Sequence, residues 1–126
     1  MVRILIADDN DVLIRSLAFI LDEVGYSVVS ASTGLEALAH LNSSAEFSLL
    51  ITDLVMPDME GIELITLLKK SHPDLPVVAL SGSVDGLDIA KQLGVKHTIA
   101  KPCIRSAVLK TVESALSKSV NPLLKA

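Results

Sequence analysis

Near its start the chain reads Val2-Arg3-Ile4-Leu5-Ile6-Ala7-Asp8-Asp9, an apolar run that ends in two carboxylates. An almost continuously apolar run of this length is typical of a strand buried on both faces, as in a parallel sheet. Residues 11–24 follow with apolar side chains three and four positions apart, the pattern of an amphipathic helix. Asp11 is expected to cap the start of this helix and Gly25 its end. The opening stretch therefore predicts a buried strand followed by a helix.

The same alternation of strand and helix continues along the chain. Further strands are expected at residues 27–31, 47–52, 75–80 and 95–100, and further helices at residues 35–41 (after a cap at Ser32 or Thr33), 62–72, 84–93 and 104–116. Gly86 weakens the helix predicted at 84–93, because glycine is a poor helix former. Such alternation implies a parallel sheet with helices on both faces, joined by right-handed crossovers. We expect one α/β domain over residues 1–118, with residues 119–126 as a C-terminal tail or the start of a linker.

The composition excludes several classes of function. The 126 residues suit one domain, and half of them are hydrophobic, which is enough for one core. The net charge is −4 and aromatic residues are 2%, so no direct contact with nucleic acid is expected, since that needs clustered Lys or Arg and stacking rings. One cysteine excludes an internal disulfide and a metal site of several cysteines. No apolar stretch approaches the ~18 residues of a membrane span, so we expect no membrane insertion and a cytoplasmic location.

Polar residues gather where the predicted strands end. Asp8 and Asp9 follow the first strand, Asp53 closes the third, Ser81 closes the fourth and Lys101 follows the fifth. The carboxyl ends of parallel strands lie on the same edge of a sheet, and ligands of such folds bind in the crevice there. Residues that are far apart in the sequence are therefore expected to converge on one pocket.

Three carboxylates in one pocket repel one another, and a hard divalent cation such as Mg²⁺ would relieve the repulsion. Lys101 and Ser81 would add a positive charge and a hydroxyl donor for a phosphoryl group, and Asp53 could act as the nucleophile that accepts it. Each residue alone has a simpler explanation: a helix cap for an aspartate, a turn for Ser81 before Gly82, a solvated loop for Lys101. The four strand ends taken together favour a shared phosphoryl-transfer site.

The chain from about Val2 to Leu116 resembles the receiver domain of two-component response regulators, of the chemotaxis-regulator type. The resemblance rests on Asp8-Asp9 after an apolar strand, Asp53-Leu54-Val55-Met56-Pro57 with Gly61 four residues on, Ser81 after an apolar strand, and Lys101-Pro102. It implies a doubly wound, flavodoxin-like fold, with a five-stranded parallel sheet in the order 2-1-3-4-5 and five helices. It also implies a signalling switch and not an enzyme, beyond Mg²⁺-dependent self-phosphorylation and slow self-dephosphorylation.

The resemblance assigns a role to each acidic residue. Asp53 would be the phosphoacceptor in a phosphorelay. The cofactor would be Mg²⁺, bound directly by Asp9 and Asp53, through water by Asp8, and by the backbone carbonyl of Val55.

Ser81 and Lys101 would bind the phosphoryl group, with Ser81 turning towards it on activation and Lys101 aimed inward by a cis peptide bond before Pro102. Two positions depart from the family pattern. Thr98 stands where receivers usually carry Tyr or Phe, so the usual aromatic switch is degenerate here. Val55 leaves no polar side chain two residues after the phosphoacceptor, from which we predict slow self-hydrolysis of the phosphorylated form.

The expected partners follow from the same resemblance. The phosphoryl donor would be a histidine kinase or a histidine phosphotransfer protein, and an unknown output partner would meet the face built from residues 84–116. Ile89, Leu93, Ile104 and Val108 are expected either on that face or in the adjoining core. A homodimer is also open. Two other functions stay open: a pseudo-receiver that binds partners without phosphorylation, and a small Mg²⁺-dependent phosphatase. The phosphatase is disfavoured because such enzymes often carry a second Asp where this chain has Val55.

Overall fold

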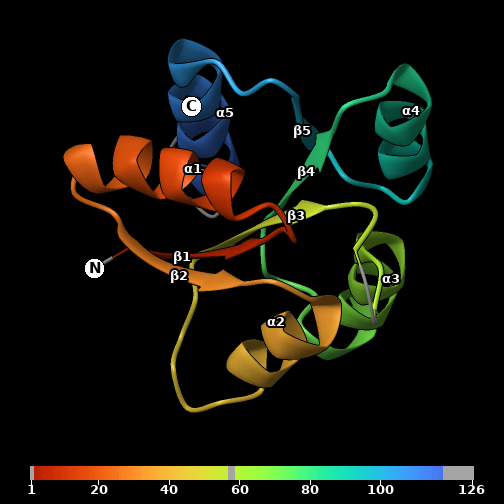
Figure 1. Cartoon of the computed structure of the whole chain (residues 1–126). Helices are drawn as coiled ribbons and strands as arrows, with labels where there is room; N and C mark the ends of the chain where they lie inside the picture. Colours follow the sequence, from red (N-terminus) through yellow and green to blue (C-terminus); the bar gives the residue numbers. More distant parts are fainter. Residues whose placement is uncertain (1, 57–58, 118–126) are drawn as a thin grey trace, which may run out of the picture.

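Five strands alternate with five helices along the chain (Figure 1). The computed structural model describes residues 2–56 and 59–117. The strands are β1 (Arg3–Ala7), β2 (Ser27–Ala31), β3 (Leu49–Asp53), β4 (Val77–Ser81) and β5 (His97–Ala100). The helices are α1 (Asp11–Glu23), α2 (Gly34–Leu41), α3 (Gly61–Ser71), α4 (Val84–Gln92) and α5 (Arg105–Ser117). Every element predicted from the sequence is present, with ends that differ by one or two residues. The predicted tail at 119–126 lies outside the described residues.

The strands form one parallel sheet in the order β2-β1-β3-β4-β5, which confirms the predicted fold class. In register, β1 pairs Ala7 with Thr52 of β3, and β4 pairs Ser81 with Ala100 of β5. The strands are short because each one crosses the core once and ends at the same edge. This register brings the last residues of β1, β3, β4 and β5 to within two residues of one another along the carboxyl edge of the sheet.

Helices cover both faces of the sheet (Figure 1). On one face α1 and α5 bury a cluster that includes Ile6, Ile51 and Leu80. On the other face α2 and α3 pack on Leu5 and Leu50, and α4 joins α3 through a smaller cluster that includes Ala79 and Ala90. The central strands β1 and β3 are apolar on both faces because helices cover both. None of the helices in the described part of the chain has the length and apolar character needed to cross a bilayer.

The helix ends explain local choices of sequence and correct one prediction. Asn10, not Asp11, is the N-terminal cap of α1: its side chain accepts a hydrogen bond from the backbone of Leu13 at 3.1 Å. Asp11 was expected to cap but lies in the first turn, where its charge still favours the helix dipole. Of the two caps predicted for α2, Ser32 and Thr33, it is Thr33 whose side chain accepts from the Glu36 N–H, at 3.0 Å. Gly25 has a φ of 95°, which glycine adopts without steric cost.

Candidate functional site

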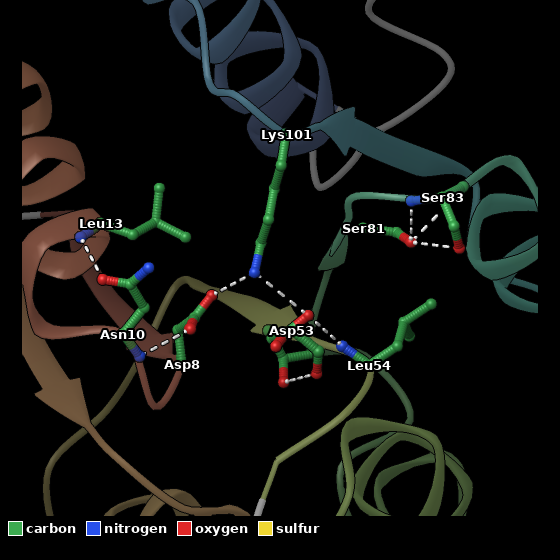
Figure 2. Close-up of polar contacts among 9 residues, drawn as sticks. Asp8, Asn10, Leu13, Asp53, Leu54, Ser81, Ser83 and Lys101 are labelled. Carbon is green, nitrogen blue, oxygen red and sulfur yellow. Dashed lines mark hydrogen bonds and ion pairs between the residues drawn. The ribbon is translucent and has the colours of Figure 1, made fainter.

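Lys101 lies between two carboxylates at the carboxyl edge of the sheet (Figure 2). Its Nζ atom is 2.9 Å from Asp8 Oδ2 and 3.4 Å from Asp53 Oδ1. The Asp8 side chain is fully buried, and the Lys101 side chain is one-quarter exposed (25%). Asp8 directly follows β1, Asp53 ends β3, and Lys101 directly follows β5. The predicted convergence of Asp8, Asp53 and Lys101 at one edge of the sheet is therefore found in the structure.

Backbone groups fix the orientation of both carboxylates. The N–H of Asn10 donates to Asp8 Oδ1 at 2.9 Å, and the N–H of Leu54 donates to Asp53 Oδ1 at 2.9 Å. The Thr52 hydroxyl donates to the Asp53 carbonyl at 2.8 Å and so holds the backbone that carries this side chain. Asp53 Oδ2 receives no such bond from the described residues. The hydrogen bond from Leu54 and the ion pair with Lys101 both go to Oδ1, so Oδ2 can take a further partner.

The electrostatics of the pocket are unbalanced in favour of negative charge. Burial raises the pKa of the Asp53 carboxyl, and the nearby Asp8 charge raises it further, while Lys101 and the Leu54 N–H act in the opposite direction. Burial alone would lower the pKa of the Lys101 ammonium, but its bonds to Asp8 and Asp53 outweigh this, and its pKa is raised. One lysine does not fully compensate the carboxylates around it. The site is therefore prepared to accept further positive charge.

The three carboxylates can hold a metal ion. One oxygen atom from each of Asp8, Asp9 and Asp53 lies within 4.8 Å of the others. Asp8 Oδ2 is buried and has, in the described part of the chain, the Lys101 ion pair but no well-directed hydrogen bond. Carboxylate oxygens are the ligands of hard cations such as Mg²⁺, so the donor set fits that ion. Val55, predicted to add its backbone carbonyl, lies in the loop after β3 with its side chain 66% exposed.

Ser81 is brought to the same edge, but its hydroxyl is directed away from Asp53 (Figure 2). The Oγ atom donates to the Ser83 carbonyl at 3.1 Å and accepts from the Ser83 N–H at 3.1 Å. The Ser81 carbonyl accepts from the Lys101 N–H at 2.9 Å, which ties β4 to the residue that carries the cation. The peptide bond between Lys101 and Pro102 is cis, as predicted. The Ser81 hydroxyl is thus bonded to Ser83 and not to the charged side chains next to it.

Thr98 lies on β5, paired with Ala79 of β4, and is half-buried. It lies on the strand next to the one that carries Ser81, two residues before the position opposite Ser81, and its side chain is smaller than the aromatic ring expected from the family pattern. On the face predicted to meet an output partner, Val84, Ile89 and Ile104 are exposed (74%, 38% and 64%), whereas Val108 is fully buried in the core. Of the four residues expected on that face or in the adjoining core, Ile89 and Ile104 are exposed, Leu93 is partly buried, and Val108 lies in the core.

The family model of the response regulator receiver domain matches residues 4–113. The chain belongs to this family. The receiver is 36% identical over 119 residues to the transcriptional regulatory protein GlrR of Escherichia coli, covering 93% of this chain and 27% of GlrR. It is 40% identical over 82 residues to the response regulator receiver protein CpdR of Brucella abortus, covering 65% of this chain and 68% of CpdR.

Solved structures agree with this family. The receiver matches a CheY-like receiver domain protein from Methanospirillum hungatei with a TM-score of 0.86 and 30% identity, over 94% of this chain and 96% of that one. It matches the chemotaxis response regulator CheY4 of Vibrio cholerae with a TM-score of 0.84 and 28% identity, over 92% of this chain and 99% of that one. The receiver thus spans about a quarter of GlrR (27%) but nearly all of the CheY4 chain in its solved structure (99%).

Four residues of the site were not predicted from the sequence: Asn10, Thr52, Leu54 and Ser83. Asn10 and Leu54 act through backbone N–H groups, which carry no signal in a sequence. Ser83 could have been found, because a serine just before a helical pattern is a typical N-terminal cap, and its side chain does accept from the Gly86 N–H at 3.0 Å. The missed residues orient the predicted ones.

Proposed function

We propose that this receiver accepts a phosphoryl group from a phosphohistidine onto Asp53, with Mg²⁺ bound, and thereby changes its contacts with a partner. The observation that carries the proposal is the position of Lys101 between Asp8 and Asp53, next to an acidic cluster suited to a hard cation. A lysine and a divalent cation close to the accepting aspartate would together offset the negative charge on the equatorial oxygens of a phosphoryl group in transfer. The proposed role of Ser81 is to donate its hydroxyl to one of those oxygens.

In the proposed transfer, Asp53 Oδ2 attacks phosphorus while the bond from phosphorus to the donor imidazole nitrogen breaks. The electron pair of that bond stays on the imidazole, and Asp53 becomes an acyl phosphate. The Leu54 N–H holds Oδ1 at 2.9 Å, so the carboxylate cannot rotate freely and one oxygen is presented to the donor. Lys101 changes partners, from a carboxylate oxygen to a phosphoryl oxygen, without leaving the pocket.

Asp8, Asp9, Asp53 and the Val55 carbonyl are the proposed holders of Mg²⁺, which when bound neutralises charge on the phosphoryl oxygens. The raised pKa of the Asp53 carboxyl supports this proposal, because a bound cation stabilises the ionised form that must attack. Asp8 is fully buried, which fits a ligand that acts through an ordered water, and Asp9 is exposed at the mouth of the pocket.

The proposed role is that of a switch and not of a turnover enzyme. Val55 offers no side chain that could orient a water molecule against the acyl phosphate, so the phosphorylated form should persist. The proposed donors are a histidine kinase or a histidine phosphotransfer protein. The proposed output surface is the α4–β5–α5 face, on which Ile89 is exposed and next to which Ile104 is exposed. The expected location in the cytoplasm stays a prediction.

The test is the intact mass of the protein after incubation with Mg²⁺ and acetyl phosphate. Wild type is expected to gain one phosphoryl group, about 80 Da, and Asp53→Ala none; omission of Mg²⁺ should abolish the gain. Asp11→Ala is the matched control, because Asp11 is an aspartate in the first turn of α1 and not a member of the acidic cluster. Phosphorylation of Asp53→Ala would refute the assignment. Steady release of phosphate without an adduct would favour the phosphatase, and inertness towards acetyl phosphate and phosphorylated kinases would favour the pseudo-receiver.

A further inference from the structure

Gly86, in the first turn of α4, leaves a notch that the Ser81 hydroxyl occupies. A Cβ atom at position 86 would overlap Ser81 Oγ and would lie 3.0 Å from Ser81 Cβ and 3.1 Å from Ser83 Oγ. A glycine inside a helix costs about 1 kcal/mol relative to alanine. Glycine at position 86 therefore lowers the stability of the helix. The space beside it is filled by the Ser81 hydroxyl, which in the proposed function must instead donate to a phosphoryl group on Asp53.

In the notch, the Ser81 hydroxyl is bonded to the residue that caps α4. It donates to the Ser83 carbonyl and accepts from the Ser83 N–H, both at 3.1 Å, and its Oγ is 3.4 Å from Ser83 Oγ. Ser83 Oγ in turn accepts from the Gly86 N–H at 3.0 Å, and the Ser83 carbonyl accepts from the Leu87 N–H at 3.3 Å. One hydroxyl thus contacts three groups of the residue from which the helix starts.

The same hydroxyl cannot reach Asp53 while it is bonded to Ser83. Figure 2 shows Ser81 Oγ joined to Ser83 and directed away from Asp53 and Lys101. A rotation of the Ser81 side chain towards a phosphoryl group on Asp53 would break both bonds to Ser83 and empty the notch beside Gly86.

We propose that Gly86 and Ser83 hold the Ser81 hydroxyl in its resting orientation, and that phosphorylation acts on α4 by withdrawing this hydroxyl from the notch. This proposal rests on the proposed function of Asp53. It gives α4 a direct connection to the site that needs no aromatic ring at position 98, where this chain has Thr98. Because α4 carries the exposed side chains of Val84 and Ile89, a shift of its first turn changes the surface that a partner meets.

The central test is Gly86→Ala, which fills the notch. Its methyl group should displace the Ser81 hydroxyl from the notch before any phosphoryl group arrives. The resting orientation, bonded to Ser83, is then lost, and the hydroxyl can adopt the inward orientation, directed towards Asp53. If the inward orientation is about a tenth populated in wild type, phosphorylation by acetyl phosphate with Mg²⁺ should become faster by up to about tenfold. The readout is the rate of mass gain. The double variant Ser81→Ala/Gly86→Ala should lose this increase, because no hydroxyl remains to be redirected.

Gly82→Ala is the matched control. It is the same chemical change next to Ser81, but a Cβ at position 82 would meet only Lys101 Cβ, at 4.0 Å. It should therefore phosphorylate at the wild-type rate. A rate for Gly86→Ala equal to that of Gly82→Ala would overturn the proposal.

A second measurement does not depend on Gly86→Ala. The Ser83 amide proton should shift upfield in the NMR spectrum when wild type is phosphorylated, because its acceptor leaves, and Ser81→Ala should show the same shift without phosphorylation. An unchanged Ser83 amide in phosphorylated wild type would overturn the proposal even if Gly86→Ala did not fold.

Failure of the proposed function gives a different result, since wild type and Gly82→Ala would then gain no mass at all. The resting orientation is still tested in that case, by the Ser83 amide of unphosphorylated Gly86→Ala. An upfield shift of this amide would support the proposal that Gly86 and Ser83 hold the Ser81 hydroxyl in its resting orientation. An unchanged amide would refute it.

Discussion

Lys101→Met is expected to destabilise the protein by leaving two carboxylates without their cation. Coulomb's law at an effective dielectric constant of about 20 gives roughly 6 kcal/mol for the contact of Nζ with Asp8 at 2.9 Å and roughly 5 kcal/mol for that with Asp53 at 3.4 Å. Much of this is offset by the cost of removing the charges from water. Loss of one partner of a buried pair usually costs about 3–5 kcal/mol. Because the Lys101 side chain is 25% exposed, we expect the lower end, about 3 kcal/mol.

The assay is thermal unfolding at pH 7 in EDTA, so that no divalent cation replaces the lysine. For a domain of this size about 4 °C of Tm corresponds to 1 kcal/mol, so the Tm should fall by about 12 °C. Lys110→Met, an exposed lysine on α5, is the control and should change stability by less than about 0.5 kcal/mol.

The double variant Asp8→Asn/Lys101→Met tests whether the loss of stability comes from the unpaired charge of Asp8. If the cost arises from a buried charge without a partner, removing the charge of Asp8 should restore more than half of the loss. Lys101→Met within about 0.5 kcal/mol of wild type, or a double variant no more stable than the single one, would refute the reasoning.

Three further outcomes follow from the site. Asp53→Asn should raise the Tm at neutral pH, because a raised folded-state pKa contributes stability that is complete below the ordinary pKa of 3.8 and lost as the pH rises through the folded-state pKa; a difference from wild type that does not grow with pH would contradict this. Mg²⁺ at about 100 times its Kd should stabilise wild type by about 2.7 kcal/mol and Asp9→Asn by much less, measured as Tm; equal responses would exclude Asp9 as a ligand. Val55→Asn should shorten the lifetime of the phosphorylated form by about tenfold, since an amide can orient water; a wild-type lifetime of only seconds would count against this.

The fold could be predicted because its signals are local and repeated. Apolar runs such as Val2–Ala7 and periodic helices such as residues 11–24 follow from burial on a covered sheet. The convergence of Asp8, Asp53 and Lys101 was predicted for the same reason, since parallel strands all end at one edge. The order of the strands was implied only by the resemblance to receivers, because no local pattern determines which strand lies beside which.

What could not be predicted is the direction of side chains. Nothing in the sequence indicates that the Ser81 hydroxyl is bonded to Ser83 and not to Asp53, because that depends on a rotamer and on the space beside it. Gly86 illustrates the same limit. From propensity alone it weakened the prediction of a helix at 84–93, whereas the structure has a helix there and shows what the glycine accommodates. A residue that is unfavourable locally can be required by a contact five residues away.

The path of the chain through the sheet also sets the order in which the site can be completed. Its carboxylates lie on β1 and β3, in the middle of the sheet, while Lys101 follows β5, the strand at the outer edge and the last to leave the ribosome. A folding intermediate that lacks β5 would expose an acidic edge with no lysine to balance it. Docking of the final strand then closes the sheet and brings in the lysine that partly offsets the negative charge of that edge. The charged cluster is in this way completed only when the whole sheet has assembled.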